Sequence, residues 1–188
     1  MLTKLFTTVL DAVSDWTDCV ATRVPLRRAS GPDEVTLDLP GYVQLDSYGC
    51  GAIAGVMALK HFKPRASFTA FYTRVSPHSE NGTATYRLIR ALRQSGLRVS
   101  ERHDLSFADL CAAIDAGSPV IVVVHNPGAE DTHWVVVYGY GRKPKRVFLA
   151  TNGFPMVTNV VLLRRFARIW SPHGNGLICA KSKRRRGA

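Results

Sequence analysis

The chain has 188 residues, a length typical of one domain with one core. Hydrophobic residues make up 46% of the sequence and charged residues 21%, which is typical of a globular protein and excludes a wholly disordered chain. No run approaches the ~18 apolar residues that a membrane-spanning helix needs. We therefore expect no transmembrane segment.

The net charge is +11, from 25 Lys and Arg residues against 14 Asp and Glu residues. Part of this excess lies in the last basic run, Lys181–Arg186. Basic tails bind nucleic acid or anionic membranes through phosphate groups. No aromatic residues alternate with these charges, as they do in proteins that bind single strands. A solvated tail or a sorting signal is therefore favoured, and nucleic-acid binding stays an alternative.

Four cysteines, Cys19, Cys50, Cys111 and Cys179, lie far apart in the sequence. No two of them form a CxxC pair, so neither a structural zinc site nor a thioredoxin-type redox motif is expected. A disulfide framework is typical of small secreted chains, and this chain is long enough to fill a core without one. We expect reduced thiols in the cytoplasm, no metal and no cofactor.

The N-terminus has apolar side chains at helical spacing from Leu2 to Trp16. Acidic residues from Asp11 onward interrupt the apolar run, so the pattern predicts a docked amphipathic helix rather than a signal peptide. The segment Arg23–Pro40 contains several prolines and is expected to be a connector with one short strand near Val35–Leu39.

The segment from Gly41 to Cys50 is rich in turn-forming residues and is expected to be irregular. It leads directly into Gly51–Phe62, where apolar residues occur on every side of a helix. Such a helix is typically buried. Pro64 is expected to end it.

Two further helices are predicted, one on each side of a strand. The first covers Ala84–Gln94, with Gly96 at its C-terminal cap. The alternating residues Leu97–Arg102 predict the strand. The second helix opens at Ser106 with the pattern of a capping box and closes at Gly117.

Three runs of β-branched and aromatic residues then predict strands over Pro119–Val124, His133–Tyr138 and Arg146–Ala150. The links between them are short and rich in turn residues, so we expect an antiparallel meander. A helical stretch, Val160–Trp170, and a short apolar segment, Leu177–Ala180, follow. The order predicts an α+β fold with the buried helix packed on an antiparallel sheet.

The predicted organisation has three parts. These are an N-terminal helix and connector over residues 1–40, one folded domain over residues 41–180, and a disordered basic tail over residues 181–188.

Cys50 has the sequence position of a nucleophile. A cysteine reacts as the thiolate, and the start of a helix favours negative charge, so we expect the buried helix to lower the thiol pKa. Gly49 and Gly51 flank Cys50 and leave room for a substrate. The other three cysteines are interpreted as small core residues.

A base and an orienting group must come from elsewhere in the chain. Of six histidines, His133 opens the most apolar strand, and His125, which ends the preceding strand, is its rival. Asn152 ends the strand that follows, where an antiparallel neighbour would bring it beside His133. Gln44, six residues before Cys50, can fold back as an oxyanion donor together with the Cys50 N–H group.

The order Gln44, Cys50, His133 and Asn152 resembles the papain-like superfamily. The run Gln44-Leu-Asp-Ser-Tyr-Gly-Cys-Gly-Ala-Ile-Ala looks most like bacterial C39-type peptidases, which process leader peptides, often after a Gly-Gly pair. The segment His133-Trp-Val-Val-Val-Tyr-Gly-Tyr is similar to the strand that carries the histidine of that family. The resemblance implies a compact α+β domain with these four residues as its catalytic groups.

Two departures from the family pattern leave the substrate open. C39-type enzymes usually have Asp followed by Pro where this chain has Asn152-Gly153, so the orienting group would be a neutral amide, as in papain. The transporter domains that often accompany these peptidases are absent from the sequence.

The preferred hypothesis is a thiol hydrolase that cleaves peptide or isopeptide bonds of a peptide or protein substrate through an acyl-enzyme. An acyl or peptidyl transferase on the same fold would use the same residues. A non-catalytic module that binds through its basic surface is the third hypothesis. The sequence leaves the oligomeric state open.

Overall fold

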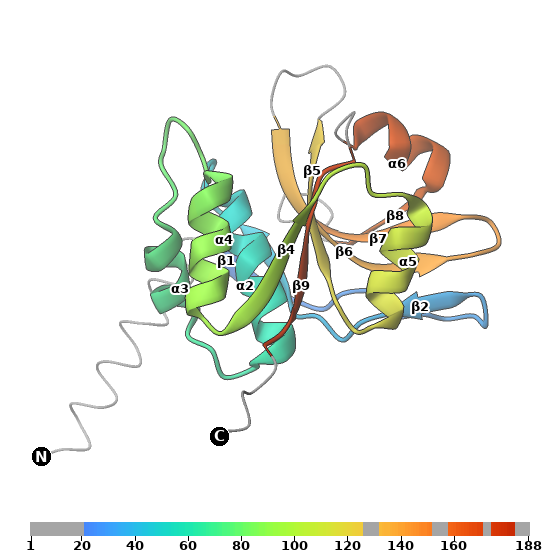
Figure 1. The fold of residues 1–188 in the computed structure, drawn as a ribbon, viewed down its shortest axis with the longest axis horizontal. Helices are drawn as coiled ribbons and strands as arrows, with labels where there is room; N and C mark the ends of the chain where they lie inside the picture. The colour runs from blue at the N-terminus through green and yellow to red at the C-terminus, as the bar shows by residue number, and fades with distance from the viewer. Residues whose placement is uncertain (1–20, 126–131, 152–157, 171–173, 183–188) are drawn as a thin grey trace, which may run out of the picture.

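A computed structural model describes residues 21–125, 132–151, 158–170 and 174–182. These residues form five helices and nine strands (Figure 1). The helices are α2 (Cys50–Phe62), α3 (Phe68–Val75), α4 (Thr85–Gln94), α5 (Phe107–Asp115) and α6 (Leu163–Ile169). The strands are β1 (Ala21–Val24), β2 (Glu34–Thr36), β3 (Gly41–Gln44), β4 (Leu97–Arg102), β5 (Val120–His125), β6 (Thr132–Gly141), β7 (Arg146–Thr151), β8 (Thr158–Leu162) and β9 (Gly176–Lys181).

The strands build two antiparallel sheets. The larger sheet has the strand order β4-β9-β5-β6-β7-β8, and β2 pairs with the far end of β6. The smaller sheet consists of β1 and β3. The meander β5-β6-β7 confirms the antiparallel arrangement that the short links predict.

Helices cover both faces of the larger sheet, as Figure 1 shows. One core contains α2, α3 and α4, together with Val136 and Tyr138 of β6. The second core contains α5, α6 and the alternate residues Val135 and Val137 of the same strand. Because successive residues of a strand point to opposite faces, β6 takes part in both cores and lies at the centre of the domain.

The α2 helix is enclosed by its neighbours. All residues from Gly51 to Leu59 are buried, which confirms the prediction of a helix apolar on every side. A Cβ atom at Gly55 would lie 2.6 Å from Leu88 Cδ1 in α4 and 2.8 Å from Phe71 Cε1 in α3. Glycine at this position therefore lets α2 contact both helices closely.

The helices around β4 agree with the sequence prediction. α4 ends before Gly96, which has a positive φ of 82°, and α5 begins at a capping box formed by Ser106 and Asp109. The structure adds β1, β3 and α3, which the sequence did not predict, whereas β2 overlaps the short strand predicted near Val35–Leu39. The expected N-terminal helix lies outside the described residues.

One prediction is wrong in part. The stretch Val160–Trp170 was expected to be helical, but β8 extends to Leu162 and α6 begins only at Leu163. β8 pairs along β7, and this pairing satisfies backbone groups that would otherwise lie at a sheet edge. Within the part of the chain that the structure describes, no helix has the length and apolar content to cross a membrane.

Ion pairs of a buried carboxylate, Glu34, stabilise the position of β2 on the large sheet. Glu34 is 8% exposed and forms ion pairs of 3.3 Å with Arg27 and 2.8 Å with Arg146 at the start of β7. The backbone N–H of Ser30 donates to the carboxylate at 2.9 Å. This hydrogen bond, followed by that of the Ser30 hydroxyl and by the two arginines, holds the pKa of Glu34 below its usual value, although burial opposes the effect.

We expect Glu34→Gln to lower the free energy of unfolding at pH 7 by about 1–3 kcal/mol, because hydrogen bonds to a charged group are lost. The folded pKa of Glu34 lies below its unfolded value, so the wild-type stability from this group is complete above the unfolded pKa of about 4.3 and is lost as the pH falls below it. Urea unfolding at several pH values measures both effects. The exposed Glu101→Gln is the control, and equal losses in the two variants would contradict the prediction.

Candidate active site

Cys50 is the first residue of α2, directly after the buried Gly49. Its thiol is partly buried. Backbone amides of Trp134 in β6 and of Gly51 make hydrogen bonds that favour the thiolate. The packing of α2 on the large sheet therefore places the sulfur against the beginning of β6.

His133 lies beside this contact, since it precedes Trp134 in β6. Its ring is half-buried, and its Nε2 atom is buried without a hydrogen-bond partner among the described residues. The Trp134 ring packs so closely over α2 that a Cβ atom at Gly51 would lie 2.8 Å from its Cδ1 atom. The end of β6 that carries His133 is thus held against the end of α2 that carries Cys50.

The rival histidine has a different environment. His125 is exposed at the end of β5 and lies opposite Thr132, while Val124 lies opposite His133. Of the two histidines, His133 is the one next to the amide that contacts Cys50. This geometry favours His133 as the partner of the thiol.

Gln44 is the last residue of β3, and its side chain bonds to the loop that leads to Cys50. Its Nε2 atom donates to Asp46 Oδ1 at 3.0 Å. A carboxylate only accepts hydrogen bonds, so this contact fixes which end of the amide faces Asp46. The amide nitrogen carries two N–H groups, so the bond to Asp46 uses one of them and leaves the other.

Asp46 organises the whole loop. The backbone N–H groups of Tyr48 and Gly49 donate to its Oδ1 atom, and the Tyr72 hydroxyl donates to its Oδ2 atom at 2.6 Å. Burial, followed by the hydrogen bond to Asp46, raises the pKa of Tyr72, so the phenol stays protonated and continues to donate. The loop between β3 and Cys50 is thereby tied to α3.

Asp46 and Tyr72 are not among the site residues predicted from the sequence. Asp46 had a detectable signal, because an aspartate followed by Ser-Tyr-Gly is typical of a turn closed by the side-chain carboxylate. Tyr72 had none, since it lies in the unpredicted α3 and meets Asp46 from 26 residues away.

The charge state of the site differs from the prediction. Burial raises the pKa of the Cys50 thiol, and the nearby Asp46 adds to the increase, although the amides of Trp134 and Gly51 oppose it. Burial lowers the pKa of His133. The expectation that the helix start leaves Cys50 with a lowered pKa is therefore wrong for the free protein, because desolvation outweighs the helix end. Both shifts favour the uncharged form of the group.

Asn152 lies outside the described residues. The strand before it, β7, ends at Thr151, which lies opposite Val135 of β6. Of the other cysteines, Cys111 is half-buried in α5 and Cys179 is fully buried in β9, where burial raises its pKa to about 12. Among the residues with a described position, no group of three or more His, Cys, Asp or Glu side chains could hold a metal ion.

Comparisons with known proteins agree on one family. Residues 36–175 match the family described as Peptidase_C39 like family. No curated protein matches the chain. Many solved structures share the fold at low sequence identity, and three of them follow.

A double glycine motif protease from an AMS/PCAT transporter, solved in complex with the leader peptide, is 18% identical with a TM-score of 0.62, and the match covers 79% of this chain and 95% of that one. The peptidase domain of Streptococcus ComA is 20% identical with a TM-score of 0.62, covering 74% and 96%. A putative C39-like peptidase from Bacillus anthracis is 14% identical with a TM-score of 0.64, covering 80% and 99%.

The raised pKa of Cys50 predicts how the thiol reacts in the absence of substrate. We expect alkylation of Cys50 by iodoacetamide to accelerate as the pH rises, with a midpoint above the value of about 8.5 for an unperturbed thiol. Mass spectrometry of the labelled peptide gives the rate at each pH, with free cysteine as the reference. A rate that is already at its plateau near pH 6 would contradict this prediction, because it would require a stored thiolate.

Tyr72 is expected to act through Gln44 as a positioning residue. Removing its hydroxyl in Tyr72→Phe leaves Asp46 with one donor fewer and lets the Gln44 amide move, so we expect kcat/KM on a peptide substrate to fall by about tenfold. In a Gln44→Ala background the same substitution should change kcat/KM little, since coupled residues are not additive. The exposed Tyr86→Phe is the control. An equal loss of kcat/KM from Tyr72→Phe in the wild-type and Gln44→Ala backgrounds would show that Tyr72 does not act through Gln44.

Proposed function

Because the chain belongs to the Peptidase_C39 like family and is a papain-like cysteine peptidase, we propose that it hydrolyses peptide bonds with Cys50, His133, Asn152 and Gln44. The observation that carries the proposal is the contact between the Cys50 thiol and the backbone amide of Trp134, next to His133. This contact joins the candidate nucleophile to the strand that holds the candidate base.

The reaction begins from uncharged groups. His133 takes the proton from Cys50 as the sulfur attacks the carbonyl carbon of the scissile bond. The C=O double bond opens, and the oxyanion accepts hydrogen bonds from the Cys50 N–H group and from the free N–H of Gln44. Such donors are placed where the charge develops, so they stabilise the transition state more than the bound substrate.

The intermediate then collapses. The C–N bond breaks, His133 returns the proton to the leaving amine, and a thioester remains on Cys50. A water molecule attacks this thioester, and His133 takes a proton from the water as it attacks. The C–S bond breaks, the thiol regains the proton from His133, and the carboxylic acid product leaves.

Asn152 is proposed to orient the imidazole. The buried Nε2 atom of His133 has no hydrogen-bond partner among the described residues, and such a group is costly unless something accepts from it. Asn152 follows directly after Thr151, which pairs with Val135 two residues beyond His133. An amide oxygen at this position would fix the tautomer that leaves the other ring nitrogen for the thiol.

The proposed substrate is a peptide. One protein with this fold was solved with a leader peptide and is described as a double glycine motif protease. We extend from it only the chemical class, a peptide chain whose scissile carbonyl enters between α2 and β6. Peptides with and without a Gly-Gly pair are both included in the test.

Incubation of the protein with a defined peptide mixture, followed by mass spectrometry, tests this function. The wild-type chain should cleave at least one class of peptide and carry a transient thioester on Cys50. Cys50→Ala should lose all cleavage, because Cys50 is the proposed site of the thioester. The matched Cys111→Ala variant should retain activity.

Two outcomes would refute the proposal in different ways. Cleavage that persists in Cys50→Ala would remove the nucleophile. Products that carry an added amine in place of a new carboxylate would assign acyl transfer instead of hydrolysis.

A further inference from the structure

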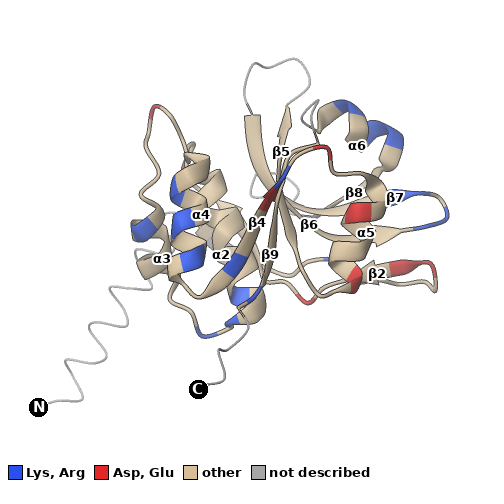
Figure 2. Cartoon of the chain, in the orientation of Figure 1, with Lys and Arg blue, Asp and Glu red and all other residues tan. Residues whose placement is uncertain are grey.

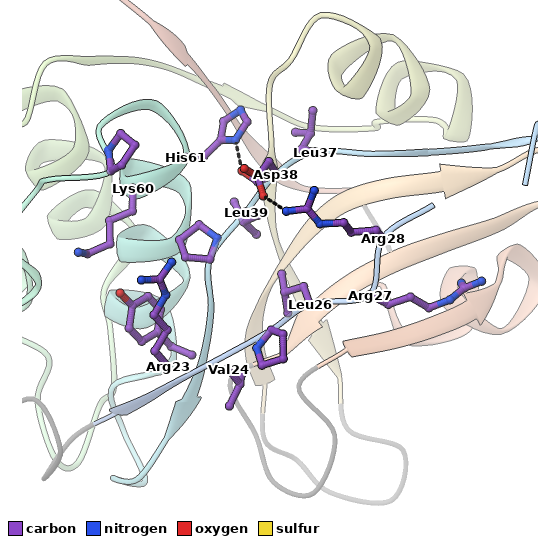
Figure 3. A pocket seen from close by; sticks show the side chains of 14 residues that line it. Arg23, Val24, Leu26, Arg27, Arg28, Leu37, Asp38, Leu39, Lys60 and His61 are labelled. Carbon is purple, nitrogen blue, oxygen red and sulfur yellow. Dashed lines mark hydrogen bonds and ion pairs between the residues drawn. The ribbon is translucent and has the colours of Figure 1, made fainter. Parts of the chain in front are cut away.

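A cavity lies at the end of α2 opposite Cys50. It has a volume of about 540 Å³ and is formed by β1, the segments on either side of β2, and the last turn of α2 (Figure 3). Lys60, in its wall, is ten residues along the helix from Cys50, which corresponds to about 15 Å at 1.5 Å per residue. The cavity is therefore separate from the candidate active site.

The lining is strongly basic. It contains Arg23, Arg27, Arg28 and Lys60 and a single carboxylate, Asp38. Arg27 is held by Glu34 outside the cavity, at 3.3 Å. Figure 3 shows Arg28 reaching across to Asp38, at 3.0 Å, but the two side chains are 81% and 85% exposed. An ion pair this exposed contributes little and is readily exchanged.

Two cations in the wall have no acidic partner within the described part of the chain, Arg23 and Lys60. Arg23 lies directly opposite Tyr42 in the β1–β3 ladder, so the two side chains share one face of the small sheet. Lys60 is half-buried. Burial, followed by the charge of Arg23, lowers the pKa of Lys60, which places the two positive charges near one another.

The other polar group of the wall is already engaged. His61 Nδ1 lies 2.7 Å from the carbonyl oxygen of Asp38, and its Nε2 atom lies 3.1 Å from that of Gly117. These bonds anchor the last turn of α2 to the segment after β2. The charged groups that can meet a ligand are therefore Arg23, Lys60 and the exchangeable Arg28.

The walls between these charges are apolar. Leu26, Leu39 and Tyr42 contribute to them, and the latter two are buried. Cavities of roughly 300–1,000 Å³ with apolar walls and a few fixed polar groups are typical of sites for small organic molecules. A ligand for this cavity needs a compact, multivalent negative group and a less polar remainder.

We propose that this cavity binds a small phosphorylated molecule, with its phosphate group held by Arg23 and Lys60. A phosphate carries up to two charges on one atom centre, so one group can neutralise both cations. The planar guanidinium matches two phosphate oxygens, while the ammonium acts as a point charge. A single carboxylate would leave one of the two cations without compensation.

Calorimetric titration of the 188-residue chain with inorganic pyrophosphate in 0.15 M NaCl tests the site. We expect binding by the wild type and by Cys50→Ala alike, which separates this result from the peptidase proposal. The double variant Arg23→Gln/Lys60→Gln should bind at least tenfold more weakly. The α6 helix also carries basic residues (Figure 2), and Arg164→Gln/Arg168→Gln removes the same charge from its exposed face and should bind as the wild type does.

Further variants keep the test decisive. Arg23→Lys/Lys60→Arg preserves the charge and should retain binding within a few-fold, with a melting temperature close to that of the wild type. Unchanged binding in Arg23→Gln/Lys60→Gln would overturn the proposal, because the anion would then sit elsewhere, for instance on the basic tail. Equal weakening in the α6 control would also overturn it, since only net charge would matter.

A second ligand separates phosphate from carboxylate. A tri-glutamate peptide should bind more weakly than pyrophosphate at the same site. Tighter binding of the peptide, lost again in Arg23→Gln/Lys60→Gln, would overturn the phosphate assignment in favour of an acidic peptide.

Discussion

The packing of α2 against β6 is the constraint on which the rest of the structure depends. The helix is buried from Gly51 to Leu59, and the first residues of β6 meet its N-terminal end. Glycine at position 51 allows the Trp134 ring to lie against the helix, and glycine at position 55 allows α3 and α4 to approach it. Small shifts of this helix would move the thiol relative to the strand that carries His133.

The loop before α2 is held by a single carboxylate. Asp46 accepts from the Gln44 amide, from two backbone N–H groups and from the Tyr72 hydroxyl. Hydrogen bonds to a charged acceptor are stronger than neutral ones, so a short irregular segment gains a fixed shape. The same charge lies close enough to Cys50 to disfavour the thiolate. The Asp46 carboxylate thus orders the loop and also makes the Cys50 thiol less acidic.

Two opposing effects meet at Cys50. The helix start and the neighbouring amides favour negative charge on sulfur, whereas burial disfavours it, and burial is the larger effect. In the free protein, burial therefore favours the neutral forms of the Cys50 thiol and of the His133 imidazole. A buried neutral thiol is also less prone to oxidation than a thiolate. Under the proposed mechanism, proton transfer to His133 accompanies the attack on substrate.

The sequence by itself determined the elements that follow from local periodicity and turn chemistry: the buried helix after Cys50, the helices around β4, and the meander β5-β6-β7. The papain-like resemblance also followed from it, because that pattern lies in short runs around Cys50 and His133. Only the tertiary structure decided the contact of Tyr72 with Asp46, the strand at β8 and the desolvation of the thiol. Each of these three features depends on which distant segments pack together, and a local sequence pattern does not specify which distant segment becomes a neighbour.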